Sequence, residues 1–169
     1  MSRWREPREK SSPYITAKGY AALETELEAL WRRRAEVTRA LSAAAAEGDR
    51  SENAEYIYRK KELRGIDSRI GFLQRRMPEL NIVTEVSDTS RIFFGASVVV
   101  ESEDGEEASY RIVGADELSQ YEGSISIDSP LARALLGKRR DDEVSVRVGE
   151  RSVIYDVIAI DYAKVDEGN

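Results

Sequence analysis

A short acidic stretch near the middle of the chain carries the residue types that could do chemistry. Residues 43–61 read AAAAEGDRSENAEYIYRKK, which places Asp49, Glu52 and Glu55 at intervals of three. The chain contains no His and no Cys, so chemistry would depend on carboxylates, hydroxyls, Lys or Arg. Carboxylate oxygens are the ligands that Mg²⁺ prefers, and Mg²⁺ typically takes one or two of them from a protein. The stretch is therefore a candidate Mg²⁺ site.

The same residues can be explained as helix punctuation. Gly48 is the residue type expected just past the C-terminus of a helix. Asp49 and Glu52 have the spacing of a capping box. Alternatively, Ser51 is the cap, and Glu52 and Glu55 lie in the first turn, where the helix dipole favours carboxylates. Spacing alone favours capping over a metal site, although the turn holds more oxygen ligands than a cap requires.

A cluster of bases with interleaved aromatic residues follows the acidic stretch. Its members are Tyr56, Tyr58, Arg59, Lys60, Lys61 and Arg64. Aromatic and basic side chains in alternation suit a single-stranded nucleic acid, whose bases and phosphates they can contact. A run of charges is more often a solvated helix face, here with Glu62 as a neutralising neighbour. The sequence leaves both interpretations open.

Two long amphipathic helices must position these residues. Apolar residues recur at helical spacing on both sides of the acidic stretch, at Leu23, Leu27, Leu30, Val37, Leu41 and Ala44 and again at Leu63, Ile66, Ile70, Leu73, Met77 and Leu80. Thr16 is a plausible N-cap of the first helix. Because few residues join the helices, they must run antiparallel with their apolar seams together, as a coiled-coil hairpin. Two carboxylates at its tip would form a metal half-site that a partner completes.

The second half of the chain has the pattern of a small sheet. Short runs rich in Val, Ile, Phe and Tyr alternate with turn signals, at residues 92–101, 108–114, 124–128, 143–148 and 153–162. Between the third and fourth runs lies one short helix, with Ser129 as N-cap, Pro130 at the first position and Gly137 as its stop. The predicted fold class is α+β: an N-terminal antiparallel α-helical hairpin, then an antiparallel sheet with one short helix.

The two halves suggest four segments along the chain. We expect an N-terminal tail over 1–13, the hairpin over 14–80, a linker over 81–91 and the sheet domain over 92–169.

Charge and hydropathy limit the partners. Residues 81–169 carry nine bases and 19 acids, so a phosphate-bearing partner should meet the first half. No apolar run approaches the roughly 20 residues of a membrane span, and the N-terminus lacks the apolar segment of a secretory signal. We therefore expect a cytoplasmic protein with no membrane partner.

Motifs in both halves resemble one known family. GDRSENAEY followed by YRKK, and then IFFGASVVVE, YRIVG, ISIDSPLARALLGK and VIAIDY, are similar to the bacterial transcript-cleavage factors of the GreA/GreB family. The resemblance covers roughly residues 14–163, and the tip with the bases after it looks more like GreB than GreA. It implies that the C-terminal domain is similar to the FKBP fold. Isomerase activity does not follow from that fold.

The resemblance also implies a function. In this family the C-terminal domain docks at the rim of the secondary channel of bacterial RNA polymerase, and the coiled coil enters the channel. The acidic tip helps to bind a second Mg²⁺ in the polymerase active site, where backtracked nascent RNA is cut to give a new 3′ end. The expected protein is thus an elongation factor, monomeric when free, that stimulates an enzyme and has no complete active site of its own.

Site residues follow from matching this sequence to the family motif. Asp49 and Glu52 match the essential acidic pair, which is the catalytic pair and the Mg²⁺ half-site. Arg59, Lys60 and Lys61 match the basic patch that holds extruded RNA. Both sets belong to the hairpin, where the residues themselves indicated a half-site with bases behind it.

A docking segment and an alternative function complete the expectations. Asp128, Ser129 and Pro130 match the segment that is associated with polymerase docking. The alternative is a channel-binding regulator that inhibits or competes without promoting cleavage, because some relatives of this architecture are inhibitors. Release of RNA from a backtracked complex would distinguish the two functions.

Overall fold

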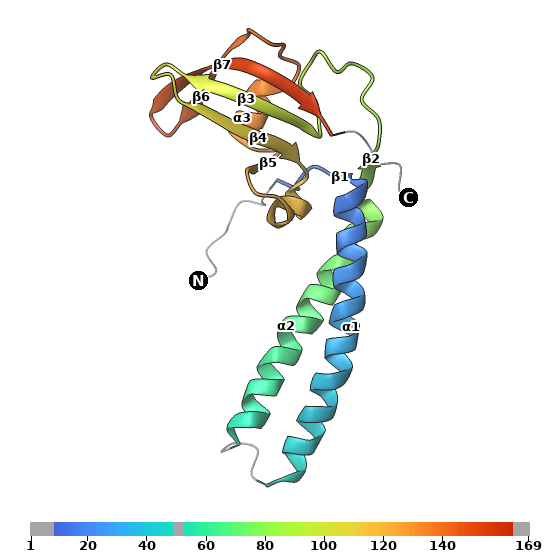
Figure 1. Cartoon of the computed structure of the whole chain (residues 1–169). Coiled ribbons are helices and arrows are strands. Elements are labelled where there is room, and N and C mark those ends of the chain that lie inside the picture. Colours follow the sequence, from blue (N-terminus) through green and yellow to red (C-terminus); the bar gives the residue numbers. More distant parts are fainter. Residues whose placement is uncertain (1–8, 49–52, 164–169) are drawn as a thin grey trace. The chain divides into compact units, whose positions relative to one another are not determined.

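The computed structural model of the chain describes residues 9–48 and 53–163 (Figure 1). The chain divides into two units. A helical unit comprises Tyr20–Leu80, and a sheet unit comprises the residues up to Gly19 together with those from Asn81 onward. The helical unit is built from α1 (Ala17–Ala46), α2 (Ala54–Arg76) and the short 3₁₀ helix η1 (Met77–Glu79). No described helix is long and apolar enough to cross a membrane.

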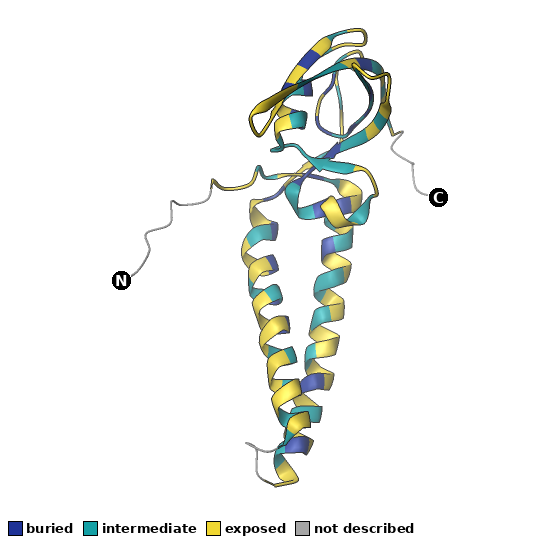
Figure 2. Ribbon diagram, turned by 90° about the vertical axis from the view of Figure 1, so that its left-hand side faces the viewer, coloured by how far each residue is buried: buried dark blue, intermediate teal, exposed yellow. Residues whose placement is uncertain are grey.

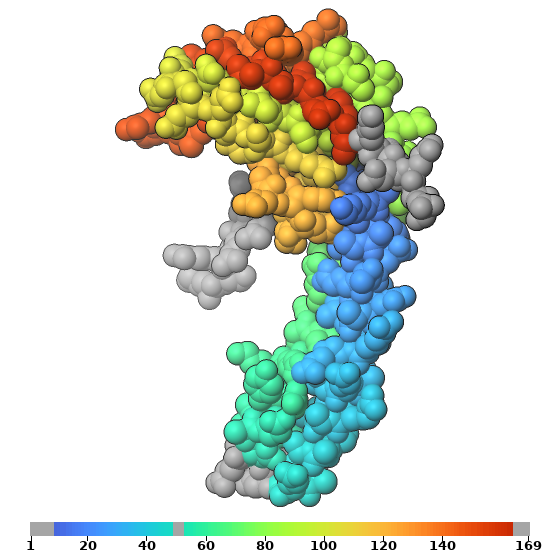
Figure 3. All heavy atoms as spheres, in the orientation of Figure 1, coloured from blue at the N-terminus to red at the C-terminus, as the bar shows by residue number. Residues whose placement is uncertain are grey.

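An apolar seam holds α1 and α2 together. Val37, Ile66 and Ile70 are buried in it, and three leucines that are partly buried pack against them: Leu27, Leu30 and Leu63. Figure 2 shows the buried positions on the inner sides of the two helices, and Figure 3 shows the two helices side by side with all atoms drawn. The predicted helical hairpin is confirmed. Its first helix has 30 residues, which corresponds to about 45 Å at roughly 1.5 Å per residue.

Ion pairs between the helices flank the seam. Arg34 Nε lies 2.6 Å from Asp67 Oδ1, and Arg69 donates to both oxygens of Glu26 at 2.6 and 3.0 Å. Glu26 precedes Arg34 in α1, whereas its partner Arg69 follows Asp67 in α2. The two helices are therefore antiparallel. Exposed pairs of this kind are each worth about 0–1 kcal/mol. Their main contribution is therefore to the register, and the seam supplies most of the stability.

The sheet unit contains a curled five-stranded sheet in the order β5-β4-β3-β7-β6. Its elements are β3 (Ala96–Ser102), β4 (Glu107–Val113), the 3₁₀ helix η2 (Ala115–Gln120), β5 (Ser124–Ser126), α3 (Pro130–Leu135), β6 (Glu143–Val148) and β7 (Arg151–Tyr162). Each predicted strand and the predicted helix is present. The fold class is thus confirmed, with Ser129 as the N-cap of α3.

One strand pairing differs from the antiparallel sheet that we predicted. β5 runs parallel to β4, with Arg111 opposite Ser124, while the other pairings are antiparallel. Parallel neighbours need a connection that returns the chain to the starting edge, and η2 lies in that connection. In the sequence, the residues between these two apolar runs show only turn signals, which do not reveal this return.

Alternation along the strands builds the core of the sheet unit. In β3, Ala96, Val98 and Val100 are buried, whereas the residues between them are only half-buried. Ala132 and Leu135 of α3 belong to the same buried cluster, and α3 lies against the curled sheet in Figure 1. Each fully buried Val or Leu stabilises the fold by about 1.5–3 kcal/mol. The period-two pattern therefore explains both the sheet and the position of its helix.

A two-stranded parallel sheet was not predicted. It pairs β1 (Tyr14–Thr16) with β2 (Asn81–Val83). The sequence analysis placed residues 81–83 in the linker, because three residues are too few to show strand alternation. The small sheet joins the residues that precede α1 to the residues that follow the helical hairpin.

Glu117 is a buried carboxylate that the sequence analysis missed. It is fully buried, and it accepts hydrogen bonds from Thr16 N at 2.9 Å, Thr16 Oγ1 at 3.0 Å and Gly114 N at 3.3 Å. Thr16 in turn accepts from Gly19 N at 3.0 Å, which confirms its predicted role as the N-cap of α1. Burial of a carboxylate is costly unless hydrogen bonds satisfy it. Here the start of α1 supplies them, helped by the helix dipole.

Close packing of Glu117 against Gly19 gives a test of this arrangement. A Cβ atom at residue 19 would lie 1.8 Å from Glu117 Oε2. We expect Gly19→Ala to lower the free energy of unfolding by about 1–3 kcal/mol, as overpacking does, measured by urea denaturation followed by circular dichroism. The matched control is Gly65→Ala in α2, where a Cβ meets nothing within 4 Å. That change should stabilise by about 0.5–1 kcal/mol. Equal effects would contradict the packing.

Candidate functional site

The end of α1 agrees with the sequence analysis. α1 ends at Ala46, and Glu47 N donates to Ala44 O at 3.2 Å. Gly48 follows with a φ of +136°, a region that glycine enters without steric cost. The predicted helix stop at Gly48 is confirmed.

The cap of α2 differs from both predicted alternatives. α2 begins at Ala54, and its N-cap is Asn53, whose Oδ1 accepts from Tyr56 N at 3.1 Å. Because Asn53 occupies the N-cap position, the predictions of Asp49 and of Ser51 as the cap were wrong. Asn, Asp and Ser are nearly equal as N-caps, and a sequence that offers all three does not decide among them.

The predicted Mg²⁺ half-site falls in a short gap in the description. Asp49 and Glu52 lie outside the described residues. Among residues 9–48 and 53–163, no three Asp or Glu side chains are grouped so that they could hold a metal ion. The structure does describe the residues that flank this pair, Gly48 and Asn53.

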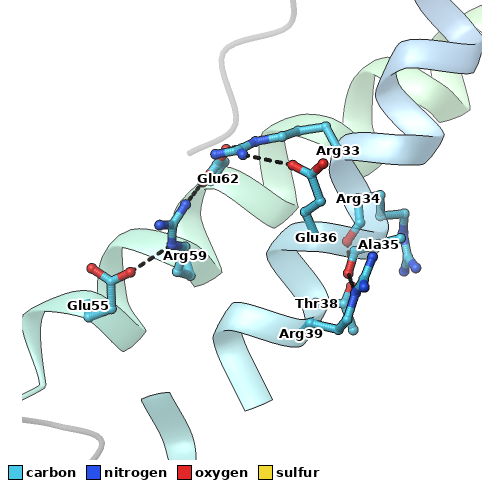
Figure 4. A network of polar contacts seen from close by, with 9 residues as sticks. All are labelled: Arg33, Arg34, Ala35, Glu36, Thr38, Arg39, Glu55, Arg59 and Glu62. Atoms are coloured by element: carbon cyan, nitrogen blue, oxygen red, sulfur yellow. Dashed lines mark hydrogen bonds and ion pairs between the residues drawn. The ribbon is translucent and has the colours of Figure 1, made fainter. Parts of the chain in front are cut away.

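A chain of ion pairs crosses between the helices next to the tip (Figure 4). On α2, Arg59 donates to Glu55 at 2.8 Å and to Glu62 at 3.1 Å. Glu62 also accepts from Arg33 of α1 at 2.7 Å, and Arg33 contacts Glu36 at 3.1 Å. Arg59 and Glu62 are 24% and 20% exposed, which is low for side chains near a helix end. The network therefore ties the first turns of α2 to α1.

Each charge in this network stabilises its neighbour. Hydrogen bonding by Arg33, and then by Arg59, holds the pKa of Glu62 below its ordinary value of 4.5. Hydrogen bonds to Glu55 and Glu62 raise the pKa of the Arg59 guanidinium. Glu62 and then Glu36 raise the pKa of Arg33 in the same way. Glu62, Arg59 and Arg33 therefore stay ionised at neutral pH.

The three bases predicted to bind RNA therefore have different surroundings. Arg59 is neutralised by two carboxylates, and its guanidinium lies 5.5 Å from the Tyr58 ring centroid. Lys60 and Lys61 are exposed, and neither makes an ion pair with a described residue. Lys60 Nζ lies 5.8 Å from the ring centroid of Tyr56. The positive charge that remains available here belongs to the two lysines.

The predicted docking segment lies at the start of α3 in the sheet unit. Ser129 Oγ accepts from Ala132 N at 3.2 Å, and Pro130 occupies the first helical position and is exposed. Asp128 Oδ2 accepts from Ser12 N at 2.8 Å, and Ser12 Oγ donates to Asp128 Oδ1. Asp128 thus anchors part of the predicted N-terminal tail. This contact joins residues 116 positions apart, and no local pattern reveals it.

Comparison with known proteins decides the family. The model described as "Transcription elongation factor, N-terminal" matches residues 13–82, and the model described as "Transcription elongation factor, GreA/GreB, C-term" matches residues 87–162. The chain belongs to the GreA/GreB family of transcription elongation factors. Together the two GreA/GreB matches cover the hairpin and the sheet, which agrees with the resemblance found in the sequence.

Individual GreA/GreB family members agree with this assignment. Transcription elongation factor GreB of Pseudomonas aeruginosa is 56% identical over 164 residues, covering 96% of this chain and 98% of that protein. GreB of Xanthomonas axonopodis pv. citri is 54% identical over 168 residues, covering 98% and 100%. The solved structure of GreA factor homolog 1 (Gfh1) of Thermus thermophilus is 28% identical, covers 88% of this chain and 97% of that one, and gives a TM-score of 0.41. That score is too low to carry an argument about the fold.

The ion-pair network predicts a specific dependence of stability on pH. Because the pKa of Glu62 is lowered in the folded chain, its contribution is fully present above pH 4.5 and is lost as the pH falls through the lowered value. We expect Glu62→Gln to lower the unfolding temperature at pH 7, with a difference from wild type that shrinks as the pH falls below 4.5. Thermal unfolding followed by circular dichroism across this range measures it.

The matched control for Glu62 is Glu28. Glu28 pairs with Arg32 at 3.4 Å within α1, and both side chains are highly exposed. Glu28→Gln should leave the unfolding temperature nearly unchanged at each pH, as exposed pairs contribute little. A Glu62→Gln difference that stayed constant as the pH fell from 7 to well below 4.5 would contradict the network.

Proposed function

We propose that this chain stimulates the cleavage of backtracked nascent RNA by bacterial RNA polymerase, with its hairpin entering the secondary channel. The observation that carries the proposal is that Asn53 caps α2, so that capping does not account for Asp49 and Glu52. Membership of the GreA/GreB family supports the partner, because its matched relatives are named transcription elongation factors. The chain would act on the polymerase and would have no complete active site of its own.

The donor set of the tip fits a shared Mg²⁺ ion. Asp49 and Glu52 would hold it, since Mg²⁺ prefers carboxylate oxygens and takes one or two from a protein. Glu55 is paired with Arg59, and Asn53 uses both of its polar side-chain atoms in hydrogen bonds. When bound, a second metal ion supplies charge stabilisation and water activation for hydrolysis of a phosphodiester. The chain's contribution would be to bring two carboxylates to the polymerase.

The hairpin suits this delivery because its end is narrow and its register is fixed. Ala43 to Ala46 add almost no side-chain bulk to the last turn of α1. The network from Arg33 to Glu55 ties the first turns of α2 to α1. A rigid support keeps functional groups near a productive geometry. The carboxylates at the tip would thus be carried on a rod with little freedom near its end.

Docking of the sheet unit at the channel rim would use the segment Asp128 to Pro130. Ser129 fixes the start of α3, and Asp128 fixes Ser12. These two side chains shape the local surface, whereas Pro130 is exposed and would meet the polymerase directly. The sheet unit would supply binding, and the hairpin would supply the carboxylates.

Removing either tip carboxylate tests the proposal. Asp49→Ala and Glu52→Ala should each lower the rate of RNA release from a backtracked complex on the order of 100-fold, as loss of a preorganised charge does. Binding to polymerase should stay close to wild type. The control is Glu28→Ala, which removes an exposed carboxylate that pairs with Arg32 within α1 and should cleave normally. RNA release at the wild-type rate by both tip variants would contradict the mechanism. Inhibition of nucleotide addition without RNA release would favour a purely inhibitory regulator.

The two exposed lysines should act differently from Arg59. If they guide extruded RNA, the double change Lys60→Ala with Lys61→Ala should slow cleavage most on extensively backtracked complexes and leave the unfolding temperature unchanged. Arg59→Ala should instead lower the unfolding temperature, because it breaks contacts to Glu55 and Glu62. Cleavage assays on complexes of different depth, paired with thermal unfolding, separate these effects. An equal loss on shallow complexes would argue against an RNA path over the lysines.

A further inference from the structure

The side chain of Asn53 bonds to both helices at the tip. Its Nδ2 donates to Ala44 O at 2.8 Å, and its Oδ1 accepts from Tyr56 N at 3.1 Å. Ala44 O is among the last four carbonyls of α1, and Tyr56 N is among the first four amides of α2. Groups in these positions lack their regular partners within the helix. Ala44 O also accepts from Glu47 N at 3.2 Å. One planar amide thus adds a bond at the end of α1 and satisfies an amide at the start of α2.

Capping alone does not explain why an amide stands at residue 53. Ser and Asp accept the hydrogen bond of an N-cap about as well as Asn. An ionised Asp accepts but does not donate, whereas Asn has both an acceptor oxygen and a donor NH₂. The bond to Ala44 O needs the donor. The amide is therefore matched to a contact that joins two helices.

We call the two hydrogen bonds of the Asn53 side chain the clamp. They join the two helix ends that flank the acidic stretch. Residues 49–52 are connected to α1 through Gly48 and to α2 through Asn53 itself. Asn53 is half-buried and Ala44 is buried, so water competes little for the bond between them. Farther along the hairpin, Glu62 of α2 accepts a hydrogen bond from Arg33 of α1 at 2.7 Å. The separation of the two helices is therefore fixed at two places near the connection.

We propose that Asn53 is a positioning residue for Asp49 and Glu52. By holding the end of α1 to the start of α2, it would limit the positions that the two carboxylates between these helix ends can take. The effect on RNA cleavage rests on the proposed function, whereas the clamp itself is a property of the free chain. Misplacement of a functional group by about 1 Å can cost a reaction on the order of 100-fold. Loss of the clamp should thus weaken the hold on Mg²⁺ without unfolding the hairpin.

Two variants separate the clamp from the cap. Asn53→Ser and Asn53→Asp each keep an acceptor for Tyr56 N and lose the donor to Ala44 O. The matched control is Thr38→Ala, which removes a hydrogen bond of the same 2.8 Å length to a backbone carbonyl, that of Arg34, within α1 alone. Thr38 is visible in Figure 4. The control tests whether any lost bond to an α1 carbonyl has the same effect.

The free chain gives a direct readout by nuclear magnetic resonance. The side-chain NH₂ of Asn53, assigned by its absence in Asn53→Ser, should exchange with water at least about tenfold more slowly than that of exposed Asn81. The backbone amide of Tyr56 should stay protected in both variants, because the cap is kept. Exchange of the Asn53 NH₂ as fast as that of Asn81 would overturn the clamp, whatever the cleavage assay gives.

Cleavage by polymerase gives the second readout. Asn53→Ser and Asn53→Asp should raise the Mg²⁺ concentration for half-maximal RNA release about tenfold, near the range for lost supporting contacts at metal sites. Polymerase binding and the release rate at saturating Mg²⁺ should stay near wild type, and Thr38→Ala should match wild type throughout. Unchanged Mg²⁺ dependence in both variants, with wild-type stimulation intact, would overturn the positioning role. No stimulation by wild type would instead overturn the proposed function, while the exchange measurement still decides the clamp.

Discussion

The helical hairpin depends on one constraint: neither long helix can keep its apolar stripe in water. Val37 of α1 and Ile66 and Ile70 of α2 meet in one seam, and this burial sets the antiparallel pairing. Ion pairs along its flanks, such as Arg34 with Asp67, then select one register among those that bury the same stripe. A fixed register in turn decides which residues stand at the tip. The candidate site thus follows from the packing of residues remote from it.

Polar side chains hold the starts of the two long helices, which the apolar seam does not fix. Glu117 holds the first turn of α1 within the sheet unit, and Asn53 holds the first turn of α2 within the helical unit. Asn53 accepts from an amide that α2 leaves unpaired at its start, and Glu117 accepts from Thr16, which caps α1. Both side chains reach a second segment of the chain. Asp128 likewise reaches a distant segment of the chain, because it accepts a hydrogen bond from Ser12 N. Residues that look like punctuation therefore also set tertiary structure.

The sequence predicts most of the fold and less of the site. Periodicity found the hairpin and all five strands of the large sheet, because Val98 and Val100, or Ile66 and Ile70, repeat with the period of their element. It missed Glu117, whose partner Thr16 is 101 residues away, and it missed the short strands β1 and β2. At the tip it could not choose a cap, since Asp, Ser and Asn have nearly equal preference. Neighbouring bases that look alike in sequence also differ. Arg59 pairs with Glu55 and Glu62 at helical spacing within α2, whereas Lys60 and Lys61 make no ion pair with a described residue.

The central claim is that the tip carboxylates complete a Mg²⁺ site inside the polymerase. The most direct test is the Mg²⁺ dependence of RNA release from a backtracked complex, for polymerase alone, with the wild-type chain, and with a double variant Asp49→Asn, Glu52→Gln at equal occupancy of polymerase. This account predicts that the wild-type chain lowers the Mg²⁺ concentration for half-maximal release, and that the double variant restores the value of polymerase alone. A double variant that lowered it as much as wild type would contradict the claim.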